Sequence, residues 1–95
     1  MSHYLIAQIT INDRDTYAGY EAGFLDIFAK YEGQIVSVDE SPRVLEGEWD
    51  HTRTVVAKFP SADAALAWYE SDEYQELAKI RFAASDANIA LVQGF

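Results

Sequence analysis

Four runs rich in β-branched and aromatic residues alternate with two stretches of helical spacing, and this order limits the fold more than any other feature. The β-like runs are 4–11, 34–39, 52–59 and 88–95, with a short extra strand predicted at 43–49. The helical stretches are 16–31 and a second in two parts, 61–70 and 72–84. The order β-α-β-β-α-β predicts an α+β, ferredoxin-like fold with an antiparallel sheet and two helices on one face.

Residues with known roles at helix ends support these boundaries. Asn12 or Asp13 can cap the first helix, and Gly33 fits its C-terminal end. Gly19 and Gly23 fall on the back of this helix, where each costs about 1 kcal/mol relative to alanine. Either another chain approaches closely at these glycines or the cost is tolerated.

The two faces of the predicted sheet differ in polarity. The face that suits the helices takes Leu5, Ala7, Ile9, Val55, Ala57 and Phe59. The opposite face mixes apolar and polar side chains: Tyr4, Ile6, Gln8, Thr10, Thr54, Val56, Lys58, Ile89, Leu91 and Gln93. A face exposed to water is ordinarily more polar than this set, and a dry core is less polar.

This mixed face predicts a homodimer, because two helices can cover only one side of a four-stranded sheet. Two copies packed face to face would form a homodimeric α+β barrel and enclose a small wet space. We expect residues such as Tyr4, Gln8 and Lys58 to line that space. The alternative is a monomer with an ordinary half-exposed sheet.

Composition excludes several classes of partner. Seven basic and sixteen acidic residues give a net charge of −9, which disfavours binding to nucleic acid and to anionic membranes. The chain has no cysteine, and its first residues show neither a basic segment nor a long apolar run, so we expect no signal peptide and no membrane span. Its 95 residues fit a single domain, 1–95, with the cytoplasm as the default location.

The segment "EGEWDHTR" at 46–53 is dense in ionisable side chains. One interpretation is an acid-base site, since His51 would titrate near neutrality and Arg53 could hold a carboxylate. Strand alternation separates His51 from the carboxylates, so such a site would need a turn at 49–52. The other is the solvated tip of a hairpin, with Trp49 covering an edge of the core. A single histidine without cysteine matches no known metal-ligand spacing, so we predict no metal and no cofactor.

Arg81 interrupts an apolar helical arc that includes Tyr74. A charge in such a stripe must reach solvent, pair with a carboxylate or face a cavity. One interpretation is therefore a structural ion pair. The other is an anion-binding arginine at the floor of a pocket with tyrosine hydroxyls nearby. Trp68 and Tyr69, on the apolar side of the preceding helix, are either core residues or part of the ligand-binding surface.

Several stretches resemble one known family: "LEGEW" at 45–49, "RTVVAKFPS" at 53–61, "AWYESDEY" at 67–74, and Arg81. Over nearly its whole length the chain is similar to domain-of-unknown-function family 1330, within the dimeric α+β barrel superfamily. Many relatives carry a small residue after the tryptophan, whereas this chain has Asp50 and His51 there. The resemblance implies a ferredoxin-like subunit and a face-to-face homodimer, and it implies no particular reaction.

Two functions of different classes are compatible with these observations. The first is binding or transformation of a small anionic or aromatic molecule in a pocket near Arg81. Its other ligand-binding candidates are Arg53, Trp68 and Tyr69, and its catalytic candidates are His51, Glu46 and Tyr74. The second function is that of a non-catalytic dimeric module with a structural, regulatory or stress-related role.

Overall fold

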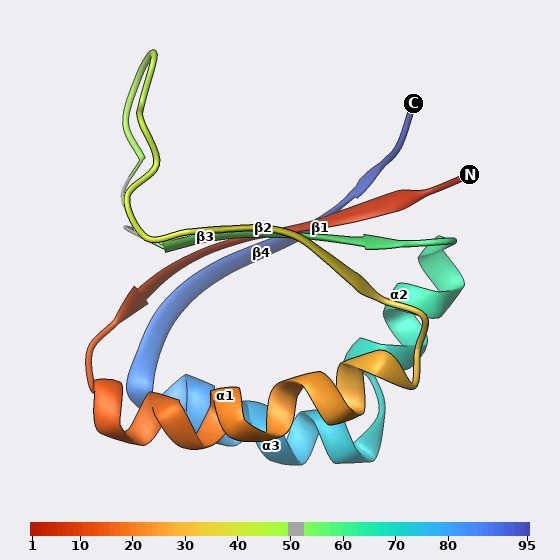
Figure 1. Ribbon diagram of the computed structural model, residues 1–95, viewed down its shortest axis with the longest axis horizontal. Coiled ribbons are helices and arrows are strands. Elements are labelled where there is room, and N and C mark those ends of the chain that lie inside the picture. Colours follow the sequence, from red (N-terminus) through yellow and green to blue (C-terminus); the bar gives the residue numbers. More distant parts are fainter. Residues whose placement is uncertain (50–52) are drawn as a thin grey trace.

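The computed structural model describes residues 1–49 and 53–95, and it confirms the ferredoxin-like α+β fold. Its elements in chain order are β1 (His3–Ile11), α1 (Arg14–Ala29), β2 (Gln34–Asp39), β3 (Arg53–Phe59), α2 (Ala62–Tyr69), α3 (Asp72–Ala84) and β4 (Ser85–Gln93). The strands form an antiparallel sheet in the order β2-β3-β1-β4. The described helices all lie on one side of this sheet, below it in Figure 1. None of them has the length and apolar character needed to cross a lipid bilayer.

Side chains cap each helix where the sequence predicts a cap. Asp13, Ser61 and Ser71 each accept a hydrogen bond from the backbone N–H three residues later, at 3.1, 3.1 and 3.2 Å. The Ser71 hydroxyl also donates to the carbonyl oxygen of Trp68 at 2.7 Å. The second helical stretch is therefore two helices, α2 and α3, which meet at this serine.

The register of the strands assigns side chains to the two faces and corrects one prediction. The pairing of β1 with β3 agrees with the predicted faces. Leu5 pairs with Leu91, and the side chains of directly paired residues point to the same face. The prediction that places Ile89, Leu91 and Gln93 on the uncovered face is therefore wrong. The residues of β4 on that face include Asn88, Ala90 and Val92.

Aromatic rings fill much of the space between the helices and the covered face. Trp68, Tyr74 and Phe59 are almost completely buried, and the ring centroids of Trp68 and Tyr74 lie 4.2 Å apart. Phe28 meets Phe59 and Trp68 edge-on at 5.2 and 5.4 Å. This cluster joins α1, α2 and α3 to the sheet.

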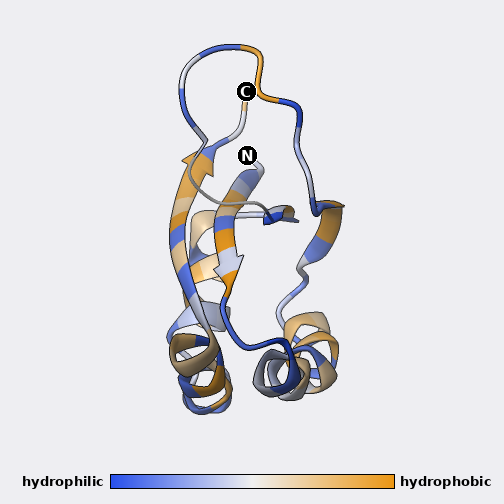
Figure 2. Ribbon diagram, turned by 90° about the vertical axis from the view of Figure 1, so that its left-hand side faces the viewer, coloured by the Kyte–Doolittle hydropathy of each residue, from blue (hydrophilic) through white to orange (hydrophobic). Residues whose placement is uncertain are grey.

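Residues 40–49 form a loop that stands off the uncovered side of the sheet (Figure 1). The predicted extra strand at 43–49 is wrong, because Gly47 adopts a φ of 75°, which interrupts extended backbone. The indole N–H of Trp49 donates to the Thr54 hydroxyl at 2.9 Å and anchors the loop to β3. Figure 2 shows a hydrophobic segment in this loop, where Leu45 is 85% exposed.

α1 packs beside α3, and two glycines of α1 face side chains of α3. A Cβ atom on Gly23 would lie 2.9 Å from a methyl group of Leu77, and one on Gly19 would lie 3.9 Å from Ile80. The segment that approaches these glycines is thus α3 of the same chain. The sequence alone suggests only a second chain beside these glycines or a tolerated cost of glycine in a helix. The structure corrects this, because the neighbour is a helix of the same chain.

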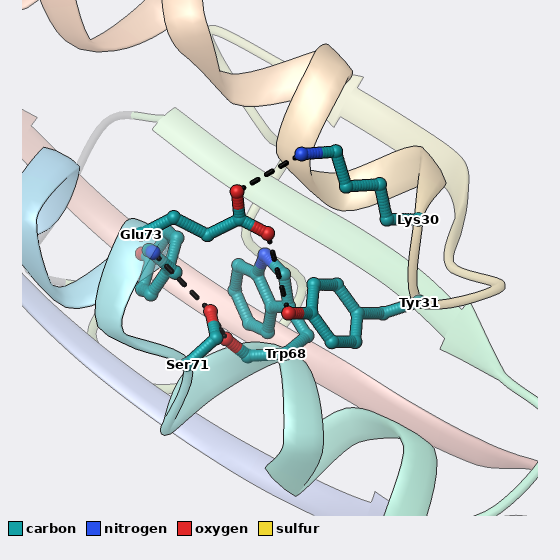
Figure 3. A network of polar contacts seen from close by, with 6 residues as sticks. Lys30, Tyr31, Trp68, Ser71 and Glu73 are labelled. Carbon is teal, nitrogen blue, oxygen red and sulfur yellow. Dashed lines mark hydrogen bonds and ion pairs between the residues drawn. The ribbon is translucent and has the colours of Figure 1, made fainter.

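A cluster of polar contacts ties the end of α1 to the start of α3 (Figure 3). The Glu73 carboxylate accepts hydrogen bonds from Lys30 Nζ at 3.0 Å and from the Tyr31 hydroxyl at 3.2 Å. The hydrogen bond between Lys30 and Glu73 lowers the pKa of Glu73 and raises the pKa of Lys30. The indole nitrogen of Trp68 points toward the same cluster.

Alanine at Gly19 and at Gly33 should change stability in opposite directions. The methyl group added at Gly19 only touches Ile80, so Gly19→Ala should raise the free energy of unfolding by about 0.5–1 kcal/mol. A Cβ atom on Gly33 would clash with the buried ring of Phe28. Gly33→Ala should therefore lower the free energy of unfolding by roughly 1–3 kcal/mol. Urea denaturation measures both variants, and a shift of the same sign in both would contradict this packing.

Glu73 should give the stability of the fold an acid-sensitive component. Folding lowers the pKa of Glu73, so the ionised carboxylate stabilises the folded state. This stabilisation is fully present above pH 4.5, the ordinary pKa of a glutamate, and it is lost as the pH falls through the lowered pKa of the folded state. Glu73→Gln should therefore flatten the acid decline of the unfolding free energy. Denaturant unfolding between about pH 3 and pH 7 measures this. Glu76→Gln, which removes an equal charge from exposed α3 surface, is the control, and an unchanged acid slope in Glu73→Gln would contradict the prediction.

Candidate functional site

A cavity of about 400 Å³ lies between the sheet and the helices. Its apolar walls come from the covered face of the sheet and from rings on the helices: Leu5, Ala7, Ile9, Ala57, Tyr17, Tyr20, Phe24, Phe28, Trp68 and Tyr74. The charged residues in its lining are Glu21, Arg53 and Arg81. Apolar walls with a few convergent polar groups, at a volume of roughly 300–1,000 Å³, are typical of small-molecule sites.

The cavity opens between α1 and β2. Leu25 on α1 and Ile35 and Val38 on β2 line it and are 63%, 39% and 47% exposed. Other lining residues, such as Phe28, are buried. The rim is therefore apolar and accessible, which suits the entry of an apolar molecule.

Arg81 is a buried charge in the cavity lining, and no carboxylate of the described residues pairs with it. It is only 4% exposed, and its Nε has no hydrogen-bond partner among those residues. Its guanidinium lies 6.0 Å from the ring centroid of Tyr20 and 4.8 Å from that of Phe82. A buried cation with this little compensation favours an anionic or acceptor group beside it.

The end of α3 holds Arg81 in place. Arg81 lies in the last turn of the helix, and the buried Ser85 hydroxyl donates to its carbonyl oxygen at 2.7 Å. Ser85 is also the first residue of β4, so α3 continues into the sheet without a connecting loop. The backbone of Arg81 is therefore fixed by both a helix and a strand.

Arg53, the second arginine of the cavity, is already compensated. It pairs with Glu21 of α1 at 3.3 Å and with Glu40, just after β2, at 3.1 Å. Its guanidinium also lies 5.6 Å from the ring centroid of Tyr17. Arg53 thus connects α1 to the β2-β3 edge of the sheet, and its charge is met by two carboxylates.

The hydroxyls of Tyr20 and Tyr74 form a buried hydrogen bond of 2.9 Å. Burial raises the pKa of Tyr20 far above its ordinary value of 10.0, and burial also raises the pKa of Tyr17. All three tyrosines line the cavity. The Tyr17 and Tyr20 hydroxyls therefore stay protonated at physiological pH and act as hydrogen-bonding groups rather than as bases.

The structure brings four of the predicted site residues together around the cavity, namely Arg53, Trp68, Tyr74 and Arg81. Tyr69 instead lines a smaller groove of about 250 Å³. Glu46 is exposed in the loop that stands off the opposite side of the sheet, so it does not join the cavity residues. His51 lies outside the described residues.

Sequence reasoning does not identify Tyr17, Tyr20 and Glu21 as site residues. The first helix carries large apolar residues at helical spacing, namely Tyr17, Tyr20, Phe24, Ile27, Phe28 and Tyr31. Such an arc is typical of a packed core, and rings that line a cavity have the same local pattern. One feature of the sequence could have indicated a cavity. Tyr17 and Tyr20 occupy positions of the first helix where phenylalanine would pack as well, and a buried tyrosine hydroxyl needs a hydrogen-bond partner. In the described part of the chain, no three histidine, cysteine, aspartate or glutamate residues group so as to hold a metal ion.

Solved structures with a similar fold include proteins of known and unknown function. A protein of unknown function from Rhodopseudomonas palustris is 19% identical, with a TM-score of 0.83 over 99% of this chain and 82% of that chain. SnoaB, a cofactor-independent oxygenase from Streptomyces nogalater, is 16% identical, with a TM-score of 0.71 over 99% and 93%. A dimeric ferredoxin-like protein of unknown function from Jannaschia is 10% identical, with a TM-score of 0.74 over 99% and 100%. At these identities the likeness shows the fold alone.

The comparison with families is more specific. No curated protein matches the chain significantly. The model of one family, a domain of unknown function, matches residues 2–95, which is nearly the whole chain. This match confirms the resemblance carried by "LEGEW", "RTVVAKFPS" and "AWYESDEY". The chain belongs to the DUF1330 family.

Proposed function

We propose that this protein binds a small aromatic molecule with an anionic group in the cavity between helices and sheet. The observation that carries the proposal is Arg81, a buried residue of the cavity lining whose guanidinium has no carboxylate partner among the described residues. An anionic group against this guanidinium would supply the missing compensation through a charge-assisted hydrogen bond. The ring of the ligand would then contact Tyr20, Phe24 and Trp68.

The described residues support binding more directly than acid-base catalysis. The raised pKa of Tyr20 keeps its hydroxyl protonated, and the Glu21 carboxylate is engaged by Arg53. SnoaB, one of the similar folds, is a cofactor-independent oxygenase, which makes transformation of the bound molecule a further hypothesis. Among the described residues of the cavity, the protonated tyrosines could assist such a reaction as hydrogen-bond donors.

We also propose that two copies pack through the uncovered faces of their sheets. Ile6 and Val56 pair across β1 and β3 on this face, and both are only partly exposed in the isolated chain. The loop 40–49, with its exposed Leu45, stands off the same side and is positioned to reach a second copy (Figure 1). The Jannaschia protein of similar fold, which is dimeric, supports this assembly.

Replacing Arg81 should abolish recognition of the anionic group. We expect naphthoate to raise the melting temperature of the wild type more than naphthamide, which has the same rings without the charge. A ligand at about 100 times its dissociation constant adds about 2.7 kcal/mol to stability. Arg81→Met, which keeps an apolar side chain of similar length, should lose the naphthoate shift and keep the naphthamide shift.

Lys79→Met is the matched control for this thermal-shift experiment. Lys79 lies on the same helix, is exposed and pairs with Glu76 at 2.8 Å, so its removal changes the net charge equally. It should leave both shifts unchanged. If no aromatic acid stabilises the wild type and Arg81→Met only alters stability, the proposed binding is wrong. The alternative of a non-catalytic dimeric module would then be favoured.

A charge in the middle of the uncovered face should separate the two copies. Val56→Glu places a carboxylate where two apolar surfaces would meet, and it should convert a dimer into a monomer at micromolar concentration. Sedimentation velocity measures the mass directly. Leu66→Glu, at an exposed position of α2 on the other side of the sheet, should remain dimeric. A wild-type chain that sediments as a monomer contradicts the assembly.

A further inference from the structure

We infer that Glu21 selects ligands with a single negative charge and excludes dianions, an inference that rests on the proposed binding of aromatic anions near Arg81. Glu21 lies on α1, lines the cavity and has a side chain that is 49% exposed. It is therefore an acidic group in the cavity wall that an entering ligand would meet. Its position makes it a specificity-determining residue.

Of the two arginines in the cavity lining, one is paired with carboxylates and one can still pair with an anionic group of a ligand. Arg53 is matched by the carboxylates of Glu21 and Glu40, at 3.3 and 3.1 Å. Arg14 also reaches Glu40, at 3.7 Å, but its side chain is 71% exposed, so solvent screens it. Arg81 therefore remains as the buried cation without a carboxylate among the described residues. One anionic group on a ligand neutralises it.

Both arginines and Glu21 act on the same end of the cavity. Two neighbouring tyrosine rings link them. Arg81 lies 6.0 Å from the ring centroid of Tyr20, and that centroid lies 5.3 Å from the one of Tyr17. Arg53 lies 5.6 Å from the Tyr17 ring and contacts Glu21 at 3.3 Å, and Glu21 follows Tyr17 by one helical turn. The charges of Arg53, Glu21 and Arg81 all influence the Tyr17 hydroxyl, although burial is the main cause of its raised pKa. A second carboxylate on a ligand held by Arg81 would therefore lie in the field of Glu21.

That second carboxylate would find no free cation there among the described residues. Arg53 is the nearest candidate, and its two terminal nitrogens already contact Glu21 and Glu40. Glu21 is half-exposed, so solvent partly screens its repulsion of a second carboxylate, and the expected effect is modest. The repulsion is larger for dianions, because monoanions carry no charge beyond the group at Arg81.

The test compares three probes with the same rings in wild type and in Glu21→Gln: neutral naphthamide, naphthoate, and a naphthalenedicarboxylate. Isothermal titration at neutral pH gives the affinities. In the wild type, naphthoate should bind most tightly and the dicarboxylate most weakly. Glu21→Gln should strengthen dicarboxylate binding by roughly fivefold relative to naphthoate and leave naphthamide unchanged. Asp26→Asn, an equal charge change at an exposed position of α1, should change none of the three affinities.

The outcomes separate this inference from the proposed function. If Glu21→Gln changes the affinity of all three probes by the same factor, Glu21 only holds the entrance in shape and the selectivity is refuted. If the wild type binds naphthoate and the dicarboxylate equally, the selectivity is refuted while the binding function stands. If no probe binds the wild type, the proposed function fails first. Glu21→Ala, which also removes the charge, should reproduce the dicarboxylate gain, and its failure to do so contradicts the inference.

Discussion

The packing of α1 beside α3 is the constraint on which the candidate site depends. Gly23 leaves room on α1 for the Leu77 side chain of α3, and the Glu73 cluster fixes the end of α1. These contacts fix the position of α1 beside α3, and a cavity of about 400 Å³ lies between the helices and the covered face of the sheet. Protein interiors are ordinarily packed without voids of this size, so the space is a property of the helix arrangement.

Within this cavity the two arginines have different roles because their surroundings differ. Arg53 is matched by two carboxylates and connects α1 to the sheet, whereas Arg81 meets mainly aromatic rings. The net charge of −9 does not cancel the attraction of Arg81 for an anion, because surface charges are screened beyond about 8–10 Å at physiological ionic strength. A strongly acidic protein can therefore still offer an anion a favourable interior position.

Local patterns predict most of the fold and only part of the site. The caps at Ser61 and Ser71 and the alternation in β1 and β3 are short-range signals, and the structure confirms them. The face assignment of Leu91 fails because it depends on pairing with Leu5, which is distant in the chain. Arg81 is conspicuous as a charge in an apolar arc. Glu21 belongs to the site because it lines the cavity and contacts Arg53, and both facts depend on the tertiary packing, which no local pattern reveals.

The direct passage from α3 into β4 limits how this chain can vary in length. Each residue added to a helix rotates the downstream chain by about 100°, and each residue added to a strand reverses its faces. An insertion between Arg81 and Ser85 would therefore either turn the guanidinium away from the tyrosines or turn Leu91 outward. The loop at 40–49 carries no such coupling. Length differences among natural relatives should accordingly concentrate in that loop, while the number of residues between Arg81 and Ser85 stays constant.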